Sequence, residues 1–247
     1  MQTRSWTGDG LKACLFDFGG TLESDGVTWQ DRFYTLYEKH GVEVDREAFR
    51  QAFYYADDSL VETGELKEAG LMETLEAQAK RVWGALELEG ESRVLDAIVT
   101  DFLDGMKWHI ERNRNLLELL KDRYKLGIVS NFYGNLHRVC EDLRIQGLFQ
   151  CLIDSSCIGV VKPDPRIFQA ALDRMSIRPH EAVFVGDNPG RDMEGAKGLG
   201  MPHIWLAGED VGRRPPCCPG DPVISSLEAL GPLLLAGRQA DTPREVA

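Results

Sequence analysis

The first clear pattern along the chain is a short apolar run that ends in a carboxylate and a glycine turn. Residues 13–18 are apolar except for Asp17, and Gly19, Gly20 and Thr21 follow directly. A run of this length bounded by glycines predicts a strand buried on both faces, as in a parallel sheet. Asp17 would lie at the carboxyl end of that strand, where open α/β sheets bind their ligands. Taken alone, the residue could equally end a strand and cap a turn.

Residues 25–106 change to a helical spacing of apolar positions. Asp25 or Thr28 can begin the first helix, and Asp45 can begin the second. Apolar side chains recur every three or four residues at Trp29, Phe33, Leu36 and Tyr37, at Phe49, Ala52, Phe53 and Leu60, at Leu71, Leu75, Ala79 and Val82, and at Val94, Ile98, Phe102 and Met106. No stretch here has the pattern of a strand. We therefore predict an insert of four helices with its own small core.

From Leu116 onward, predicted strands and helices alternate. Strands are expected at residues 125–130, 149–156, 182–187 and 203–207, and helices at 116–124, 134–143, 163–175 and 193–200. This alternation predicts a parallel sheet wound by right-handed crossovers. A loop rich in proline and glycine follows at 208–222, then a short strand and helix at 223–235. The polar end of the chain, from residue 237, is expected to fray.

Composition and charge exclude several classes of function. The chain of 247 residues has a net charge of −12, which would repel nucleic acids and anionic membranes. No apolar run approaches the ~20 residues that a membrane span needs, and the N-terminus has no signal-peptide pattern. We expect a soluble, cytoplasmic protein. The six cysteines have no Cys-x-x-Cys spacing, so we interpret them as reduced structural residues rather than a zinc site or a disulfide framework.

Four ordered motifs carry a resemblance to a known family. FDFGGTL, IVSN, VVKPDPRIF and VGDNPGRDMEGAKGLGM resemble the four motifs of the haloacid dehalogenase-like (HAD) hydrolase superfamily, and the match extends over residues 12 to 235. The resemblance implies an α/β fold in which a Rossmann-like parallel sheet core carries an inserted helical cap. The core would comprise residues 1–24 and 107–237, the cap 25–106, and a disordered tail 238–247.

The resemblance also implies a set of catalytic roles. Asp17 corresponds to the nucleophile, which forms an aspartyl-phosphate in the phosphatases of the family. Mg²⁺ would be held by Asp17, by the backbone carbonyl of Gly19 and by Asp187, with Asn188 and Asp192 orienting the site. For a Gly-Asp pair that ends a strand, a tight turn is the alternative interpretation.

Further residues match the groups that bind phosphate in the family. Thr21 and Ser130 correspond to hydroxyl donors, and the backbone amides after Asp17, including that of Gly20, would help to hold phosphate. Lys162 corresponds to the lysine that neutralises phosphoryl oxygens, although a lysine before proline is also common at a surface. Asn131 could contact the substrate or bond the turn backbone. The implied partner is a small phosphorylated metabolite, bound by a monomer or a homodimer.

One departure from the family pattern leaves alternatives open. Phosphatases of the family carry a second Asp, the general acid, two residues after the nucleophile, where this chain has Gly19. Relatives without that acid include haloacid dehalogenases, which lack the Gly-Asp pair and need no metal, and phosphonate hydrolases, which use a cap lysine. The chain could also be a weakly active or inactive relative that binds a ligand.

The missing acid also leads to an expectation about substrates. Glu23 and Asp25 are near enough in sequence to substitute for it, although a solvated turn is the other interpretation of both. If nothing substitutes, aryl and acyl phosphates should react far faster than alkyl phosphates, because an alkoxide leaves poorly without a proton. Trp29, Phe33 and Tyr37 are candidates to line the site from the cap, with packing in the core as the alternative.

Overall fold

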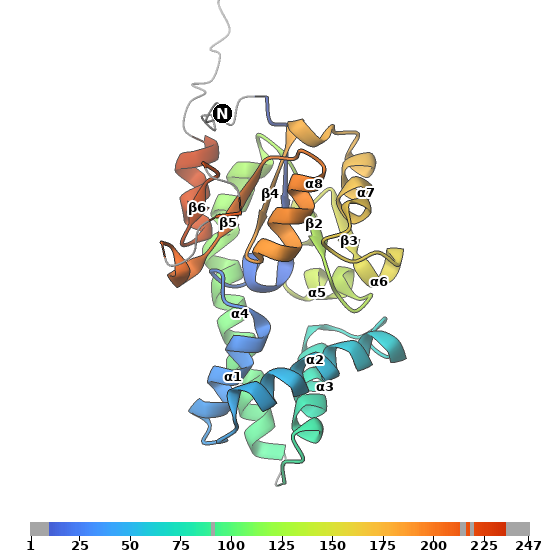
Figure 1. Cartoon of the computed structure of the whole chain (residues 1–247), viewed down its shortest axis with the longest axis vertical. Helices are drawn as coiled ribbons and strands as arrows, with labels where there is room; N and C mark the ends of the chain where they lie inside the picture. Colours follow the sequence, from blue (N-terminus) through green and yellow to red (C-terminus); the bar gives the residue numbers. More distant parts are fainter. Residues whose placement is uncertain (1–9, 90–91, 213–215, 218–219, 236–247) are drawn as a thin grey trace, which may run out of the picture.

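The computed structural model describes residues 10–89, 92–212, 216–217 and 220–235, so the predicted tail at 238–247 lies outside the described residues. Six parallel strands form one sheet in the order β3-β2-β1-β4-β5-β6 (Figure 1). They are β1 (Ala13–Phe16), β2 (Lys125–Ser130), β3 (Cys151–Asp154), β4 (Ala182–Gly186), β5 (His203–Leu206) and β6 (Val223–Ile224). The predicted α/β class with a parallel, Rossmann-like sheet is confirmed.

Both faces of the sheet are buried, which explains why its strands are continuous apolar runs. On one face Phe16 packs with Val139 of α5 (Leu136–Asp142) and with the last turns of α4. On the other face Leu15 packs with α7 (Pro165–Met175) and α8 (Glu194–Gly198). A short helix, α6 (Ser155–Ile158), follows β3, and after β6 the expected helix is reduced to two short turns at residues 227–229 and 231–235.

Four helices lie between β1 and β2. They are α1 (Trp29–Lys39), α2 (Arg46–Thr63), α3 (Leu71–Ala85) and α4 (Ser92–Lys121), and Figure 1 shows α1 to α3 beyond the carboxyl ends of the strands. Thr28 and Asp45 cap α1 and α2 by accepting backbone N–H groups, as predicted, whereas Asp25 caps neither. Among the described residues, no helix is both long enough and apolar enough to span a membrane.

Helix α4 crosses one predicted domain boundary. The boundary is predicted between residues 106 and 107, whereas α4 runs without a break from Ser92 to Lys121 and joins the helical part to the sheet. The apolar stripe through Met106 continues at Ile110 and Leu117, and Asn113 lies between them on the same face. Asn113 is fully buried and donates from Nδ2 to the carbonyl of Leu22 at 3.1 Å. This polar position interrupted the pattern and concealed the continuity of the helix.

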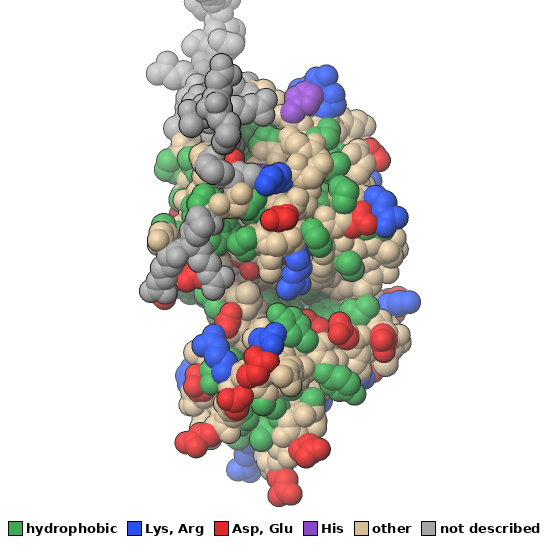
Figure 2. Space-filling model, viewed as in Figure 1, with side chains coloured by type: hydrophobic (Ala, Val, Ile, Leu, Met, Phe, Trp, Pro, Cys, Tyr) green, Lys and Arg blue, Asp and Glu red, His purple; other side chains and the backbone are tan. Residues whose placement is uncertain are grey.

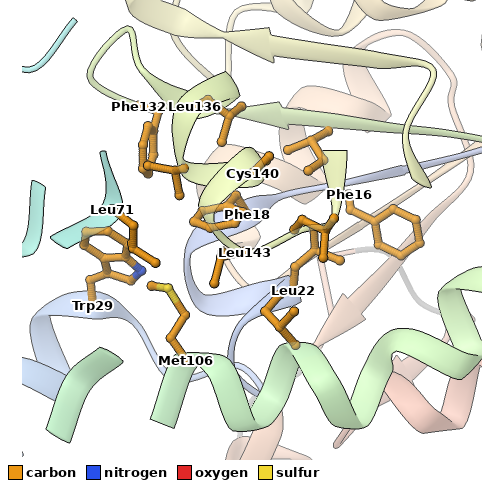
Figure 3. Packing of buried hydrophobic residues seen from close by; sticks show 14 of the residues in the cluster. Phe16, Phe18, Leu22, Trp29, Leu71, Met106, Phe132, Leu136, Cys140 and Leu143 are labelled. Carbon is orange, nitrogen blue, oxygen red and sulfur yellow. The ribbon is translucent and has the colours of Figure 1, made fainter. Parts of the chain in front are cut away.

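The inserted helices do not have a separate core. Their buried side chains form one continuous cluster with the side chains on one face of the sheet. Figure 3 shows Trp29 beside Leu71 and Met106, with Phe18 and Phe132 close to them. The Phe132 ring contacts both Trp29 and Phe18, at centroid distances of 5.8 and 5.5 Å. The prediction of an independent core was therefore wrong, because these aromatic side chains extend the packing from one part into the other.

The cysteines within the described residues carry free thiols. Cys14, Cys140 and Cys151 are buried, and burial raises the pKa of each thiol above its usual value. Cys157 is exposed, and the sulfur of Cys217 lies 3.6 Å from Nε2 of His203. Cys218 lies outside the described residues.

Candidate active site

Two adjacent strands bring Asp17 and Asp187 together. Strands β1 and β4 pair in parallel, with Phe16 opposite Val185, and the backbone N–H of Asp17 continues this pairing to the carbonyl of Val185 at 2.9 Å. Asp187 follows β4 directly. Because the carboxyl ends of parallel strands share one edge, both carboxylates face the same space above the sheet.

One oxygen of Asp17 accepts three hydrogen bonds. Its Oδ1 accepts from the backbone N–H of Phe18 at 2.7 Å, from Oγ of Ser130 at 2.8 Å, and lies 2.8 Å from Nζ of Lys162. The residue is only 8% exposed. Three donors on one oxygen hold a buried carboxylate in one orientation. Asp17 is thus more than the end of a strand.

Lys162 is a buried cation between two carboxylates, not a surface lysine. Its Nζ contacts Asp17 at 2.8 Å and Asp192 at 2.7 Å, and the residue is 4% exposed. Burial acts to lower the pKa of Lys162, but the two carboxylates outweigh it and raise the pKa above its usual value. Asn131 fixes the backbone of Lys162 by two hydrogen bonds, of 2.8 and 3.3 Å. Asn131 therefore forms hydrogen bonds with the backbone of this turn, and it also lines the pocket described below.

Three carboxylates gather around this lysine. Asp17, Asp187 and Asp192 each offer an oxygen within 4.8 Å of the others. Burial and the neighbouring carboxylates raise the pKa of Asp187 well above its usual value, and burial raises that of Asp192 to about 6. Three buried carboxylates beside one ammonium leave an excess of negative charge that a divalent cation would neutralise. Carboxylate oxygens are the donors that Mg²⁺ prefers, so these residues fit the implied metal.

The glycine turn after Asp17 shapes this cluster. Gly20 has a φ of +81°, and a Cβ there would lie 2.6 Å from Oδ2 of Asp187, so only glycine fits. Its N–H donates to Oε1 of Glu23 at 2.8 Å, so the expected contribution of this amide to phosphate binding is not supported. Gly19 lines the pocket with an ordinary φ of −69°.

Two other predicted residues hold the framework of the site. Thr21 is fully buried and donates from Oγ1 to Oδ1 of Asp187 at 3.0 Å, which orients the carboxylate rather than a phosphate. Asn188 accepts at Oδ1 from the N–H groups of Gly190 and Arg191, at 3.1 and 3.0 Å, and so caps the turn that carries Asp192.

A pocket of about 150 Å³ lies over these residues. The sheet side contributes Asp17, Gly19, Ser130, Asn131, Phe132, Tyr133, Lys162, Asp187, Asn188 and Arg191, and the helical side contributes Thr28, Trp29, Gln30, Phe53, Tyr54 and Asp57. Of the three expected helical residues only Trp29 lines it, because Phe33 and Tyr37 are fully buried among the helices. The contribution of α2 was missed, since nothing in the spacing of its residues distinguishes Asp57 from other surface acids.

Glu23 and Asp25 are excluded as replacements for the missing acid. Glu23 is fully buried, forms an ion pair with Arg32 and accepts from Nε1 of Trp29 at 3.0 Å. Asp25 forms a two-pronged pair with Arg112, with both distances 2.7 Å. Neither residue lines the pocket.

Comparison with known proteins confirms the class of protein that the fold and the site indicate. The family model described as haloacid dehalogenase-like hydrolase matches residues 11–200, and the chain belongs to this family. It is 29% identical over 180 residues to "Haloacid dehalogenase-like hydrolase domain-containing protein 3" of Mus musculus, covering 69% of this chain and 72% of that protein.

Two further comparisons extend this result. A glyceraldehyde 3-phosphate phosphatase of Pyrococcus furiosus is 37% identical over 96 residues, covering 38% of this chain and 39% of the relative. The crystal structure of a dehalogenase with an intermediate complex superposes with a TM-score of 0.65 at 23% identity, covering 93% of this chain and 99% of the other. This likeness shows a shared fold. The resemblance deduced from the four motifs is confirmed, and the chain is a hydrolase of this family.

Proposed function

We propose that the protein is a Mg²⁺-dependent phosphatase of small phosphorylated metabolites that works through an aspartyl-phosphate on Asp17. The observation that carries the proposal is the cluster of three carboxylates around the buried ammonium of Lys162. A dehalogenase without a metal has no evident use for such an excess of buried negative charge. The partial likeness to a phosphatase supports the same chemistry.

The residues around Asp17 suit attack on phosphorus. Oδ1 is occupied by three donors, which leaves Oδ2 as the attacking oxygen. Lys162 pairs with the carboxylate and lies where it can neutralise phosphoryl oxygens, and Ser130 contributes a hydroxyl beside it. A metal held by Asp17, Asp187 and the carbonyl of Gly19 would supply positive charge to the phosphoryl group. Thr21 keeps Asp187 in position for that task.

The size and cover of the pocket indicate the substrate class. A volume of about 150 Å³ admits a phosphoryl group with a small leaving group and little more. Side chains of α1 and α2 close the side opposite Asp17, which keeps bulk water from the phosphoryl-enzyme. Cytoplasmic metabolites of a few carbon atoms fit these limits.

Replacement of the nucleophile tests the proposal. Asp17→Asn should reduce phosphate release by at least ~10³-fold and abolish the phosphoryl-enzyme detected by mass spectrometry, because an amide cannot form the acyl phosphate. Asp104→Asn is the matched control, since Asp104 is exposed on α4 and lies outside the pocket. Phosphatase activity that survives both Asp17→Asn and metal chelation would refute the mechanism.

The same assays separate the two alternatives. Halide release from a 2-haloacid without added metal would identify a dehalogenase. Tight Mg²⁺-dependent binding of a phosphorylated metabolite, with no turnover across a substrate panel, would identify a ligand-binding relative.

A further inference from the structure

Residue 19 carries no carboxyl group, and Trp29 of α1 lies beside it. A Cβ on Gly19 would lie 3.4 Å from Nε1 of Trp29, at ordinary contact distance, and the N–H of that indole is already donated to Glu23. A proton for the leaving group must come from another direction, and the opposite wall of the pocket belongs to the helices.

Only one carboxyl group on that wall is available. Among the described residues, the carboxylates that line the pocket are those of Asp17, Asp187 and Asp57. Asp17 is the proposed nucleophile and Asp187 the proposed metal ligand. Asp57 belongs to α2, so it faces the strand ends from the helical side, where the leaving group of a substrate held by Asp17 would lie.

The surroundings of Asp57 suit proton transfer. Asp57 is half-buried, and burial raises its pKa to about 6. The hydroxyl of Tyr133 donates to its Oδ1, and this bond acts with Arg191 and Gln78 to limit the rise of the pKa, while Asp58 adds to it. A carboxyl group with a pKa close to neutrality can both give and take a proton in the working range of an enzyme.

Resting on the proposed function, we propose that Asp57 is the general acid and base of the reaction, acting from the inserted helices in place of the acid absent at position 19. In the first step Oδ2 of Asp17 bonds to phosphorus, the bond from phosphorus to the leaving oxygen breaks with its electron pair on that oxygen, and Asp57 gives its proton to it. In the second step the Asp57 carboxylate takes a proton from water as the water oxygen bonds to the phosphorus of the aspartyl-phosphate, and the bond from phosphorus to Oδ2 of Asp17 breaks with its electron pair on Oδ2. The Asp17 carboxylate and the protonated Asp57 are then restored.

Tyr133 is a positioning residue in this arrangement. It is buried after β2, on the sheet side of the pocket, and its hydrogen bond reaches across to α2. The bond fixes one oxygen of Asp57 and stabilises the ionised form of the carboxyl group. Tyr133 thus ties the proton donor on the helices to the part of the molecule that holds the nucleophile.

A series of phosphate esters tests the role of Asp57. With Asp57→Asn, kcat for an alkyl phosphate should fall by ~10²-fold or more, whereas kcat for p-nitrophenyl phosphate should change by less than about fivefold, because a nitrophenolate leaves without a proton. The matched control is Glu62→Gln, an exposed acid of α2 outside the pocket, which should change kcat for neither substrate. The steep dependence of rate on leaving-group pKa predicted from the sequence is then expected in Asp57→Asn, and a shallow one in the native enzyme.

The pH profile separates a proton donor from a structural residue. In the native enzyme kcat for the alkyl phosphate should fall as pH rises above the pKa of Asp57. Tyr133→Phe removes a bond to the ionised form, so the descending limb should move to higher pH. The limb should be absent in Asp57→Asn.

Several outcomes would overturn the inference. An equal loss for alkyl and aryl phosphates, or a change confined to KM, would make Asp57 a substrate-binding residue. Unchanged kinetics in Asp57→Asn would show that Asp57 has no role in the reaction. In either case an inactive Asp17→Asn would leave the proposed function standing, whereas an active Asp17→Asn would refute that function whatever Asp57 does.

Discussion

The sheet and the inserted helices meet at one pocket but supply it with different kinds of residue. The ends of β1, β2 and β4 and the loop before α7 supply Asp17, which is the proposed nucleophile, its hydroxyl and ammonium partners and the acidic cluster. The helical side supplies apolar walls, the amide of Gln30, the hydroxyls of Thr28 and Tyr54, and the single carboxyl of Asp57. The sheet thus sets the chemistry, and the helices set what reaches it and how the leaving group is treated.

The two parts also differ in charge. Residues 25–106 contain 8 Lys and Arg against 19 Asp and Glu, whereas the rest of the chain contains 20 against 21. Nearly all of the net charge of −12 is therefore on the helical part, and Figure 2 shows acidic side chains gathered on the lower, helical half of the molecule. The rest of the chain is nearly balanced, and its main local excess of negative charge is the buried cluster of Asp17, Asp187 and Asp192 beside Lys162.

The largest effect should come from breaking the charge balance on the sheet side. Lys162→Met leaves Asp17 and Asp192 without their shared cation, so the carboxylates must take up protons. We expect kcat to fall by ~10³-fold or more and the free energy of unfolding to fall by about 3–5 kcal/mol. Phosphate release and urea denaturation measure the two effects. Lys197→Met on the exposed side of α8 is the control, and equal behaviour of the two variants would contradict the role of Lys162.

A second substitution tests the junction of the two parts. Glu23 follows the nucleophile turn and pairs with Arg32 of α1, whose burial lowers its pKa to about 10. Glu23→Gln would leave this buried guanidinium unpaired, at a cost of about 3 kcal/mol in the free energy of unfolding. Denaturation should show this loss, and activity should also fall because the Gly20 amide loses its ionic partner. Glu47→Gln, at an exposed pair within α2, should leave the free energy of unfolding nearly unchanged, because solvent screens this pair.

The third prediction concerns metal and pH. In the metal-free protein, Asp187 and Asp192 hold protons at pH values where they would be ionised in the unfolded chain, so their contribution to stability falls as pH rises from about 4 through 6. Mg²⁺ binds the ionised carboxylates and removes this penalty. The increase in Tm caused by Mg²⁺ should therefore be larger at pH 7.5 than at pH 5 by about 4 °C or more.

Thermal denaturation at constant ionic strength measures this difference. Asp187→Asn should show little increase in Tm with Mg²⁺ at either pH. An increase of the same size at both pH values in the native protein would contradict the assignment of these carboxylates to a metal.

The smallest effect tests the acidic surface of the helices. Their net negative charge should slow the approach of a phosphorylated substrate, and salt should screen it. Raising the ionic strength from about 20 to 200 mM should increase kcat/KM by about twofold. A double variant, Glu62→Gln with Glu68→Gln, removes two exposed charges outside the pocket and should weaken the dependence on salt. A decrease of kcat/KM with salt would show that the field of the helices does not act on the substrate.

The sequence predicted the residues at strand ends well. Asp17, Ser130 and Asp187 come directly after or at the end of buried apolar runs, and parallel strands bring such ends together whatever the details of packing. Only the resemblance assigned Lys162 to the site, because nothing in the sequence around a lysine before proline indicates whether its side chain is buried. The class of fold required nothing beyond the alternation of strands and helices.

The remaining features depend on contacts that spacing does not encode. The hydrogen bond from the Gly20 amide to the Glu23 carboxylate depends on the tight geometry of one turn. In the sequence, Asn113 is a polar residue that interrupts a stripe of apolar positions. Its burial is explained only by its hydrogen bond to the carbonyl of Leu22, which the sequence does not reveal. Asp57 is one of many acids on the helices, and only the packing of α2 against the strand ends distinguishes it.

The continuity of α4 determines how the pocket can open. Two flexible linkers would let the helical part swing freely, but one of its two connections is a helix of 30 residues, about 45 Å long. Any change in the tilt of the helical part relative to the sheet would therefore have to bend α4. Gly105, in the middle of α4 and beside Arg32, is its weakest point, since glycine weakens a helix by ~1 kcal/mol.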